Sequence, residues 1–177
     1  VKYLSHQNGW WRMTAQKEII LRQDKSIGSS LQKLVREGKG IGRIHAMWTM
    51  EGLGLAGPEF ALPLLSDSDH RVRQTAIRLL EPFFLSGDNS YLKNVVSLMK
   101  DDNPRVVAQA INSIQFLKSS EVTDHILDGM MANDNNEFVK GVGRLALSLK
   151  KGGRNSRNSS SLSVSGLHSF KKGRDIY

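Results

Sequence analysis

The chain has 177 residues, no cysteine and a formal net charge of +8, and 39% of its residues are hydrophobic. This length allows one domain with a real core. The lack of cysteine excludes disulfides, thiolate metal sites and covalent haem attachment within the chain. No run of 18 apolar residues is present, so we predict no membrane-spanning helix. The chain begins at Val1 without a secretory leader, as expected of an excised or processed segment.

The positive charge is concentrated near the C-terminal end. Residues 150–177 contain seven Lys or Arg and one Asp, whereas residues 1–149 contain 18 basic and 16 acidic residues. A nucleic-acid-binding domain usually carries its basic patch on the folded body. The nearly neutral body therefore gives little support to that function.

Five amphipathic segments share a pattern around a small residue. In chain order they read GWWRMTAQKEI, IGRIHAMWTM, HRVRQTAIRLL, PRVVAQAINSI and EFVKGVGRLAL. The small residues are Ala15, Ala46, Ala76, Ala110 and Gly143, at intervals of 31, 30, 34 and 33 residues. Such regular spacing predicts structural repeats. The residue three positions earlier is basic in four segments: Arg12, Arg43, Arg73 and Lys140.

A second amphipathic stretch follows each of the first four segments. These stretches read SSLQKLVREG, PEFALPLLSDS, SYLKNVVSLMKD and EVTDHILDGMMAN. Each repeat is therefore predicted to be a helix, a short turn and a second helix, with Asp, Asn, Gly, Ser and Pro in the turns. No segment alternates apolar and polar residues as a strand does, so we predict no sheet.

Asp and Asn recur at set distances before the later small-residue helices. Asp67, Asp101 and Asp134 lie five residues before a valine, and Asp69, Asn103 and Asn136 lie three before it. Side-chain oxygens there can accept hydrogen bonds from the free N–H groups of a helix start. We expect Val72 and Val106 to be buried, and Ala76 and Ala110 to let the neighbouring helix approach closely. The basic residue should reach an Asp of an adjacent turn, giving a ladder of ion pairs between repeats.

The motif from Asp67 to Ala76, repeated from Asp101 to Ala110, resembles the HEAT-repeat family. The resemblance covers residues 1–149 and implies an all-α fold, a right-handed α-solenoid of about five helical hairpins. Val107 stands where the family usually has Arg, which puts the ladder in doubt at that step. The resemblance implies a non-catalytic scaffold rather than an enzyme. We therefore assign no catalytic, cofactor-binding or metal-binding residue, and expect a protein partner or a neighbouring domain.

Two stretches, Asn8–Ala15 and Gly42–Gly54, resemble the helical segment of multidomain membrane-bound dehydrogenases found mainly in planctomycetes and related bacteria. In that family a β-propeller precedes the HEAT repeats and a c-type cytochrome domain follows them. The resemblance implies a scaffold within an electron-transfer protein, in a periplasmic or other extracytoplasmic location. It implies haem c only for a downstream domain, and no cofactor in this chain.

The end of the sequence is divided into two parts. Residues 150–166 are rich in Gly, Ser, Asn and Arg and are predicted to be a flexible linker. Residues 167–177 end in FKKGRDIY and resemble the first helix of a c-type cytochrome domain, with Phe170, Gly173 and Tyr177 on one helical face. A basic tail with coincidental aromatic spacing is the alternative.

Other candidate sites are weaker. The histidines, His6, His45, His70, His125 and His168, form no metal-binding motif. GLGLAG at residues 52–57 is predicted to be a turn between helices rather than a phosphate-binding loop. Trp11 occupies a valine position, so we expect it and Trp48 in the core, and leave Trp10 open as a stacking surface.

Two rival functions remain open. A HEAT-like DNA glycosylase would need a basic concave face, and we expect the second helices to line it. Their basic residues, Lys33, Arg36, Lys93 and Lys100, form no continuous stripe, so we do not expect nucleic acid as a partner. A HEAT-like lyase would need converging acids, and the acids available are scattered over different repeats: Glu51, Glu59, Asp124 and Asp128.

Overall fold

The computed structural model describes residues 1–117 and 121–155. Within these ranges the fold is all-α, with nine α-helices, three short 3-10 helices and no strand. The α-helices are α1 (Gly9–Arg22), α2 (Gly28–Glu37), α3 (Ile41–Gly52), α4 (Pro58–Leu64), α5 (His70–Ser86), α6 (Leu92–Val96), α7 (Pro104–Ile114), α8 (Glu121–Ala132) and α9 (Glu137–Asn155). The 3-10 helices are η1 (Lys2–Ser5), η2 (Lys25–Ile27) and η3 (Ser97–Lys100). Of the described helices, none is both long and apolar enough to cross a membrane.

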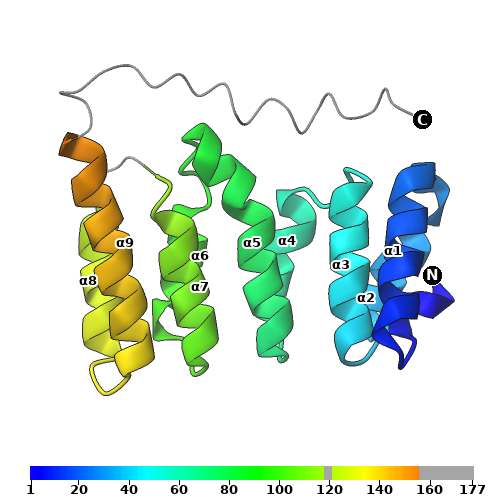
Figure 1. Cartoon of the computed structure of the whole chain (residues 1–177), viewed down its shortest axis with the longest axis horizontal. Coiled ribbons are helices and arrows are strands. Elements are labelled where there is room, and N and C mark those ends of the chain that lie inside the picture. The colour runs from blue at the N-terminus through cyan, green and yellow to red at the C-terminus, as the bar shows by residue number, and fades with distance from the viewer. Residues whose placement is uncertain (118–120, 156–177) are drawn as a thin grey trace.

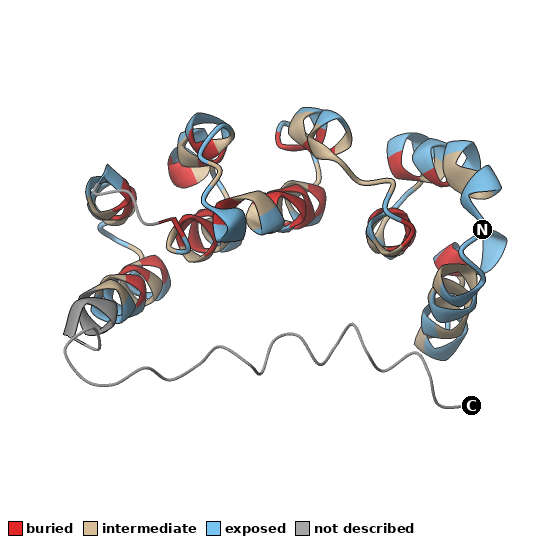
Figure 2. Cartoon of the chain, turned by 90° about the horizontal axis from the view of Figure 1, so that it is seen from above, coloured by how far each residue is buried: buried red, intermediate tan, exposed pale blue. Residues whose placement is uncertain are grey.

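The helices form two layers (Figure 1). The five small-residue helices, α1, α3, α5, α7 and α9, stand side by side in one layer, which we call the inner layer. The outer layer contains α2, α4, α6 and α8. Seen from above in Figure 2, the inner layer curves into an arc whose hollow side faces away from the outer layer. The concave face is therefore lined by the small-residue helices.

Each outer helix packs on the inner helix that follows it in the chain. The main contacts join α2 to α3, α4 to α5, η3 to α7 and α8 to α9. The hairpins predicted from the sequence pair each small-residue helix with the stretch that follows it. This predicted order of the two helices within a hairpin is wrong. A repeating sequence reads the same from either starting point, and its period does not say which two helices pack. The same error put the wrong helices on the concave face.

The small residues and valines do pack as expected. Ala46, Ala76 and Ala110 are fully buried, and so are Val72 and Val106. Inner-layer neighbours contact one another, most extensively α5 with α7. At Gly143, an added Cβ atom would lie 2.3 Å from the sulfur of Met130, so the Met130 side chain of α8 packs directly on the glycine. Small side chains therefore set the spacing of the helices.

The polar turns before the inner helices act as predicted. The carboxylate of Asp69 accepts the backbone N–H of Arg71, and the amide oxygen of Asn103 accepts that of Arg105, both at the N-cap. Asp67 and Asp101 accept the N–H groups of the two capping residues themselves, at 2.9 and 2.8 Å. Each cap contributes on the order of 1 kcal/mol and defines where its helix begins.

The predicted ladder is present at two joints. Arg43 of α3 pairs with Asp67, before α5, through both guanidinium nitrogens. Arg73 of α5 pairs with Asp101, before α7, through two hydrogen bonds of 2.7 Å. The Arg73 and Asp101 side chains are only 11% and 5% exposed. Since these pairs are nearly buried, removing one partner leaves a charge without its counterion.

The next joint lacks the ladder, as Val107 suggested. Val107 is fully buried, and Asp134 pairs instead with Lys140 on α9, the helix that it precedes. Hydrogen bonds to backbone carbonyls cross this joint: the Asn133 amide donates to the Met99 carbonyl at 3.0 Å. Lys150 also donates to the Leu117 carbonyl at 2.7 Å. At the other end, the Arg12 side chain donates to the backbone carbonyls of His6 and Gln7, and to no carboxylate in the described part of the chain.

Helix α9 continues to Asn155, so residues 150–155, predicted as the start of a linker, are helical. The rest of that linker and the predicted cytochrome-like segment at 167–177 lie outside the described residues.

The Arg73 ladder pair should contribute strongly to stability. We expect Arg73→Leu to lower the free energy of unfolding by about 3 kcal/mol, because Asp101 is left buried without its counterion. Arg71→Leu, two positions away on α5, is the matched control. Its pair with Asp69 is more exposed and should be worth less than about 1 kcal/mol. Urea unfolding measures both, and equal losses would contradict the role of the ladder.

Acid should weaken the turns before α5 and α7. Hydrogen bonds from Arg71 lower the pKa of Asp69 to about 2. Burial is the largest single influence on Asp67 and Asp101 and would raise their pKa values. The hydrogen bonds and charges of Arg43 and Arg73, together with the hydrogen bonds from the backbone N–H groups two residues on, outweigh burial, so both pKa values are lowered. A carboxylate of this kind stabilises the fold above its unfolded pKa of about 3.9, and the gain is lost as the pH falls through the folded value.

The Asp69→Asn variant isolates this effect because asparagine retains the helix cap. We expect it to be less stable than the wild type at pH 5 and above, and the difference to shrink as the pH falls from about 4 to 2. Thermal unfolding followed by circular dichroism measures the difference at each pH. A difference that is the same at pH 7 and pH 2 would exclude the Asp69 charge as its source.

Candidate functional site

The candidate site is the concave face of the inner layer. On α5, Val72, Ala76 and Leu80 share the buried face, whereas Arg71 and Arg78 lie on the opposite side of the helix. The same outward positions, five before and two after the small residue, recur on every inner helix. They are occupied by Trp10, Lys17, Ile41, Trp48, Arg71, Arg78, Arg105, Asn112, Phe138 and Leu145.

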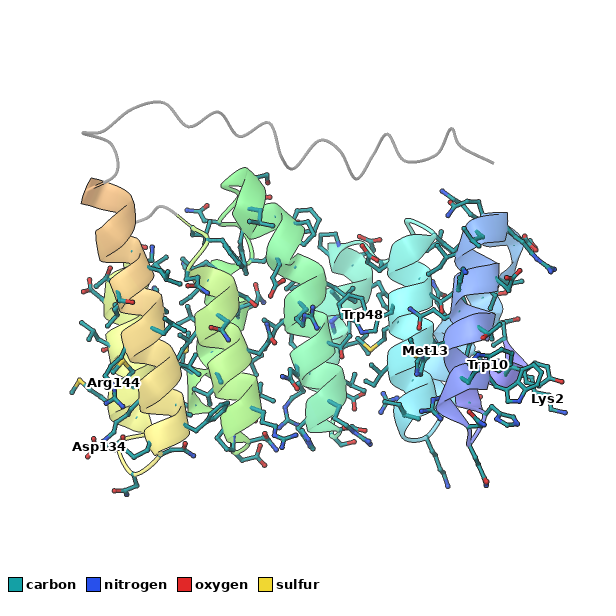
Figure 3. The ribbon with its side chains drawn as sticks, in the orientation of Figure 1. Lys2, Trp10, Met13, Trp48, Asp134 and Arg144 are labelled. Atoms are coloured by element: carbon teal, nitrogen blue, oxygen red, sulfur yellow. The ribbon has the colours of Figure 1, made fainter. Side chains whose placement is uncertain are left out.

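Large apolar side chains are exposed at both ends of this face. The N-terminal apolar cluster consists of Trp10, Met13, Leu21 and Ile41, on α1 and α3, with exposed fractions of 64, 68, 66 and 41%. The C-terminal apolar cluster consists of Phe138, Leu145 and Leu149 on α9, each more than half exposed. Figure 3 shows Trp10 and Met13 projecting from α1. Exposed apolar clusters of this kind mark interaction surfaces.

The middle of the face is polar and basic. The guanidinium group of Arg78 lies over the ring of Trp48, 4.9 Å from its centroid, in a cation–π contact. Arg105 on α7 is exposed, and among the described residues neither it nor Arg78 has a carboxylate within ion-pair distance. Arg43 and Arg73, by contrast, are both paired. We call Arg78 and Arg105 the basic centre; it leaves two positive charges available to a ligand.

Polar bonds between helices hold the face in shape. His45 on α3 is hydrogen-bonded to Gln16 on α1 at 2.7 Å. Burial lowers the pKa of His45, and the nearby Arg12 lowers it further, so the ring is neutral at pH 7. Between α5 and α7, the Glu81 carboxylate accepts hydrogen bonds from Gln109 and Ser113 at 2.9 and 2.7 Å. These hydrogen bonds therefore hold the inner helices that carry the exposed side chains in fixed positions relative to one another.

The tryptophans do not all lie where the sequence suggested. Trp11 is 44% exposed, so its expected place in the core was wrong. It stacks on Tyr3 at 5.6 Å and meets Trp10 edge to face at 4.9 Å. In the described chain α1 contacts η1 and α3, and no outer helix precedes it to cover Trp11. Trp48 is half-buried beneath Arg78.

The other residues singled out from the sequence are not brought together. Lys33 and Arg36 lie on α2, Lys93 on α6 and Lys100 on η3, all outside the inner layer. The acids of the lyase hypothesis, Glu51, Glu59, Asp124 and Asp128, are spread over α3, α4 and α8. GLGLAG does connect two helices, α3 and α4, with Gly54 in the left-handed region at φ 68°. Within the described ranges, no three His, Cys, Asp or Glu residues are grouped as metal ligands would be.

Trp10, left open as a stacking surface, is exposed on this face. The other concave residues were missed because the face was predicted to lie on the other helices. A signal for them was present: Trp10, Ile41 and Phe138 occupy an outward position where a solvent-facing helix would carry a polar residue. Reading the outward positions of the repeat, rather than its buried ones, would have found the two clusters.

Stacked helical hairpins with a built concave surface define a helical-repeat module. A family model described as HEAT repeats matches residues 58–148, which is just over half of the chain. The chain belongs to the HEAT-repeat family, whose members are generally protein-interaction scaffolds. No curated protein and no solved structure matched the chain.

Proposed function

We propose that this chain is a non-catalytic scaffold, a right-handed solenoid of about five hairpins, that holds a protein partner on its concave face. One observation carries the proposal: the inner helices expose large apolar side chains on the side that no other helix of the described chain covers. Folding does not require this exposure, because the opposite side of the same helices already supplies the core. A protein partner would remove this surface from water and gain the corresponding hydrophobic free energy.

The same face suggests what the partner presents. Two apolar clusters at the ends call for apolar side chains on the partner, and the unpaired Arg78 and Arg105 between them call for carboxylates. Exposed aromatic and arginine side chains are the residue types that most often dominate binding energy at interfaces. The partner is therefore expected to carry acidic residues between two apolar patches.

The concave face can be tested with a matched pair of double variants. Met13→Ser with Leu145→Ser removes one apolar side chain from each concave cluster. Met131→Ser with Leu127→Ser removes the same two residue types from α8 in the outer layer, where they are 75 and 42% exposed. We expect the concave variant to bind a captured partner at least tenfold more weakly, a loss of about 1.4 kcal/mol or more. The outer variant should bind like the wild type.

The measurement is quantitative capture from extracts of the source cells, followed by titration of each purified partner. Both variants should unfold at the wild-type temperature, since the altered side chains are exposed. A partner that the two variants lose equally does not bind the concave face, and that result would reject the proposed docking surface.

Nucleic acid is the competing ligand, because Lys17, Arg78 and Arg105 all lie on concave positions. The exposed apolar clusters favour a protein ligand, since a phosphate backbone has no apolar groups to bury against them. Three results together would identify nucleic acid, rather than a protein, as the ligand of the concave face. Binding of a duplex oligonucleotide would fall steeply with salt and persist after removal of residues 156–177. It would be lost in the double variant Arg78→Gln with Arg105→Gln. A HEAT-like lyase activity is the third possibility, and turnover by the isolated chain would establish it.

We further propose that the scaffold belongs to a multidomain dehydrogenase–cytochrome protein outside the cytoplasm, where it separates a propeller from a haem c domain. The support is the resemblance of Asn8–Ala15 and Gly42–Gly54 to that family. We expect the gene to encode Cys-x-x-Cys-His within about a dozen codons after Tyr177, the motif that attaches haem c. A coding sequence that continues for a domain's length without this motif would remove the cytochrome from the proposal.

A further inference from the structure

A second hollow lies on the other side of the molecule, between the outer helices α2 and α4. Its volume is about 280 Å³. It is lined by Gln32, Val35, Arg36, Leu55, Glu59, Phe60, Pro63 and Leu64. None of these residues belongs to the concave face. The volume lies just below the usual range for drug-sized ligands, about 300 to 1,000 Å³, so there is room for a bulky side chain.

The floor of this α2–α4 groove is apolar and held in place. Val35 is fully buried and Leu64 is 9% exposed, while Leu55 and Phe60 are half-buried. Leu55 comes from the turn between α3 and α4, and its N–H donates to the Met50 carbonyl at 2.8 Å. Its side chain rests on Gly28, where an added Cβ would lie 3.1 Å away. Little reorganisation is needed before a ligand enters.

Opposite charges stand on the two walls. Arg36 projects from α2 and Glu59 from α4, and both are exposed. Across the described residues neither side chain has a hydrogen bond or ion pair, either with the other or with a third group. The groove thus offers an apolar floor between one free cation and one free carboxylate.

We propose that the α2–α4 groove binds a peptide segment of another protein that carries one bulky apolar side chain between an acidic and a basic residue. The apolar side chain fills the hollow above Leu55 and Phe60. The acidic residue pairs with Arg36 and the basic residue with Glu59. Charge complementarity argues against a purely apolar ligand, which would leave both charges at the rim unpaired and partly desolvated. This site is separate from the concave face and does not depend on its function.

Three acetylated pentapeptides with a central leucine serve as probes. The leucine is flanked by Glu and Lys in the mixed peptide, by two Glu in the acidic peptide and by two Lys in the basic peptide. Titration of the ¹⁵N-labelled chain, followed at the amides of Leu55, Gly57 and Phe60, measures each affinity. We expect the wild type to prefer the mixed peptide by about threefold, the size of effect that an exposed ion pair provides. The mixed peptide with serine in place of leucine should not bind.

Single charge reversals make the test specific. Arg36→Glu leaves two acids at the rim and should transfer the preference to the basic peptide, whereas Glu59→Arg should transfer it to the acidic peptide. Lys93→Glu on α6 is the matched control, with an exposed charge reversed away from the groove, and should leave the preference unchanged. All three variants should keep the wild-type unfolding temperature.

The proposal is overturned if no peptide shifts these amides, or if the order of preference is the same in the wild type and both reversals. Binding at the concave face is a separate outcome. The Met13→Ser with Leu145→Ser variant should bind the mixed peptide like the wild type. If it loses the peptide instead, the probe has bound the concave face and the groove is not its site.

Discussion

Two nearly buried arginine–aspartate pairs fix how the central inner helices α3, α5 and α7 lie against one another. Arg43 and Arg73 each leave the first turn of one inner helix and reach the carboxylate that organises the turn before the next. Because a charge in such a position must keep its partner, the pairs allow little variation in distance or angle. They accompany close packing at Ala46 and Ala76, which brings the helices near enough for the pairs to form. The middle of the arc, where α3, α5 and α7 line the concave face, follows from these contacts.

Much of this framework could be predicted from the sequence. Residues with an obligatory physical role repeat visibly, as the buried Ala76 and Ala110, the capping Asp69 and Asn103, and the pairing Arg73 all do. The missing pair at Val107 was also predictable, since valine cannot replace a guanidinium group. The packing partner of each helix was not predictable, because the repeat pattern has no beginning. The exposure of Trp11 depends on which helix is available to cover α1, and its own position carries no such information.

The two candidate surfaces illustrate how a repeat fold separates stability from recognition. The buried side of each inner helix is constrained to be small or aliphatic, whereas its outward positions vary from Trp48 to Arg78 to Asn112. The predictions rested on the buried positions and therefore did not identify these outward ones as a surface. The α2–α4 groove arises differently, from the short α4 and the turn before it. The concave face therefore follows from variation at repeated positions, and the groove from a local departure from the repeat.

The arginine–aspartate pairs between repeats affect how such a chain can evolve. Some repeats carry both an arginine near the helix start and an aspartate in the preceding turn. Such a repeat can form an ion pair with an identical repeat on either side. Gene duplication can therefore lengthen the arc by whole units while the existing joints stay intact. The distance between the two apolar clusters can thus change stepwise over evolutionary time.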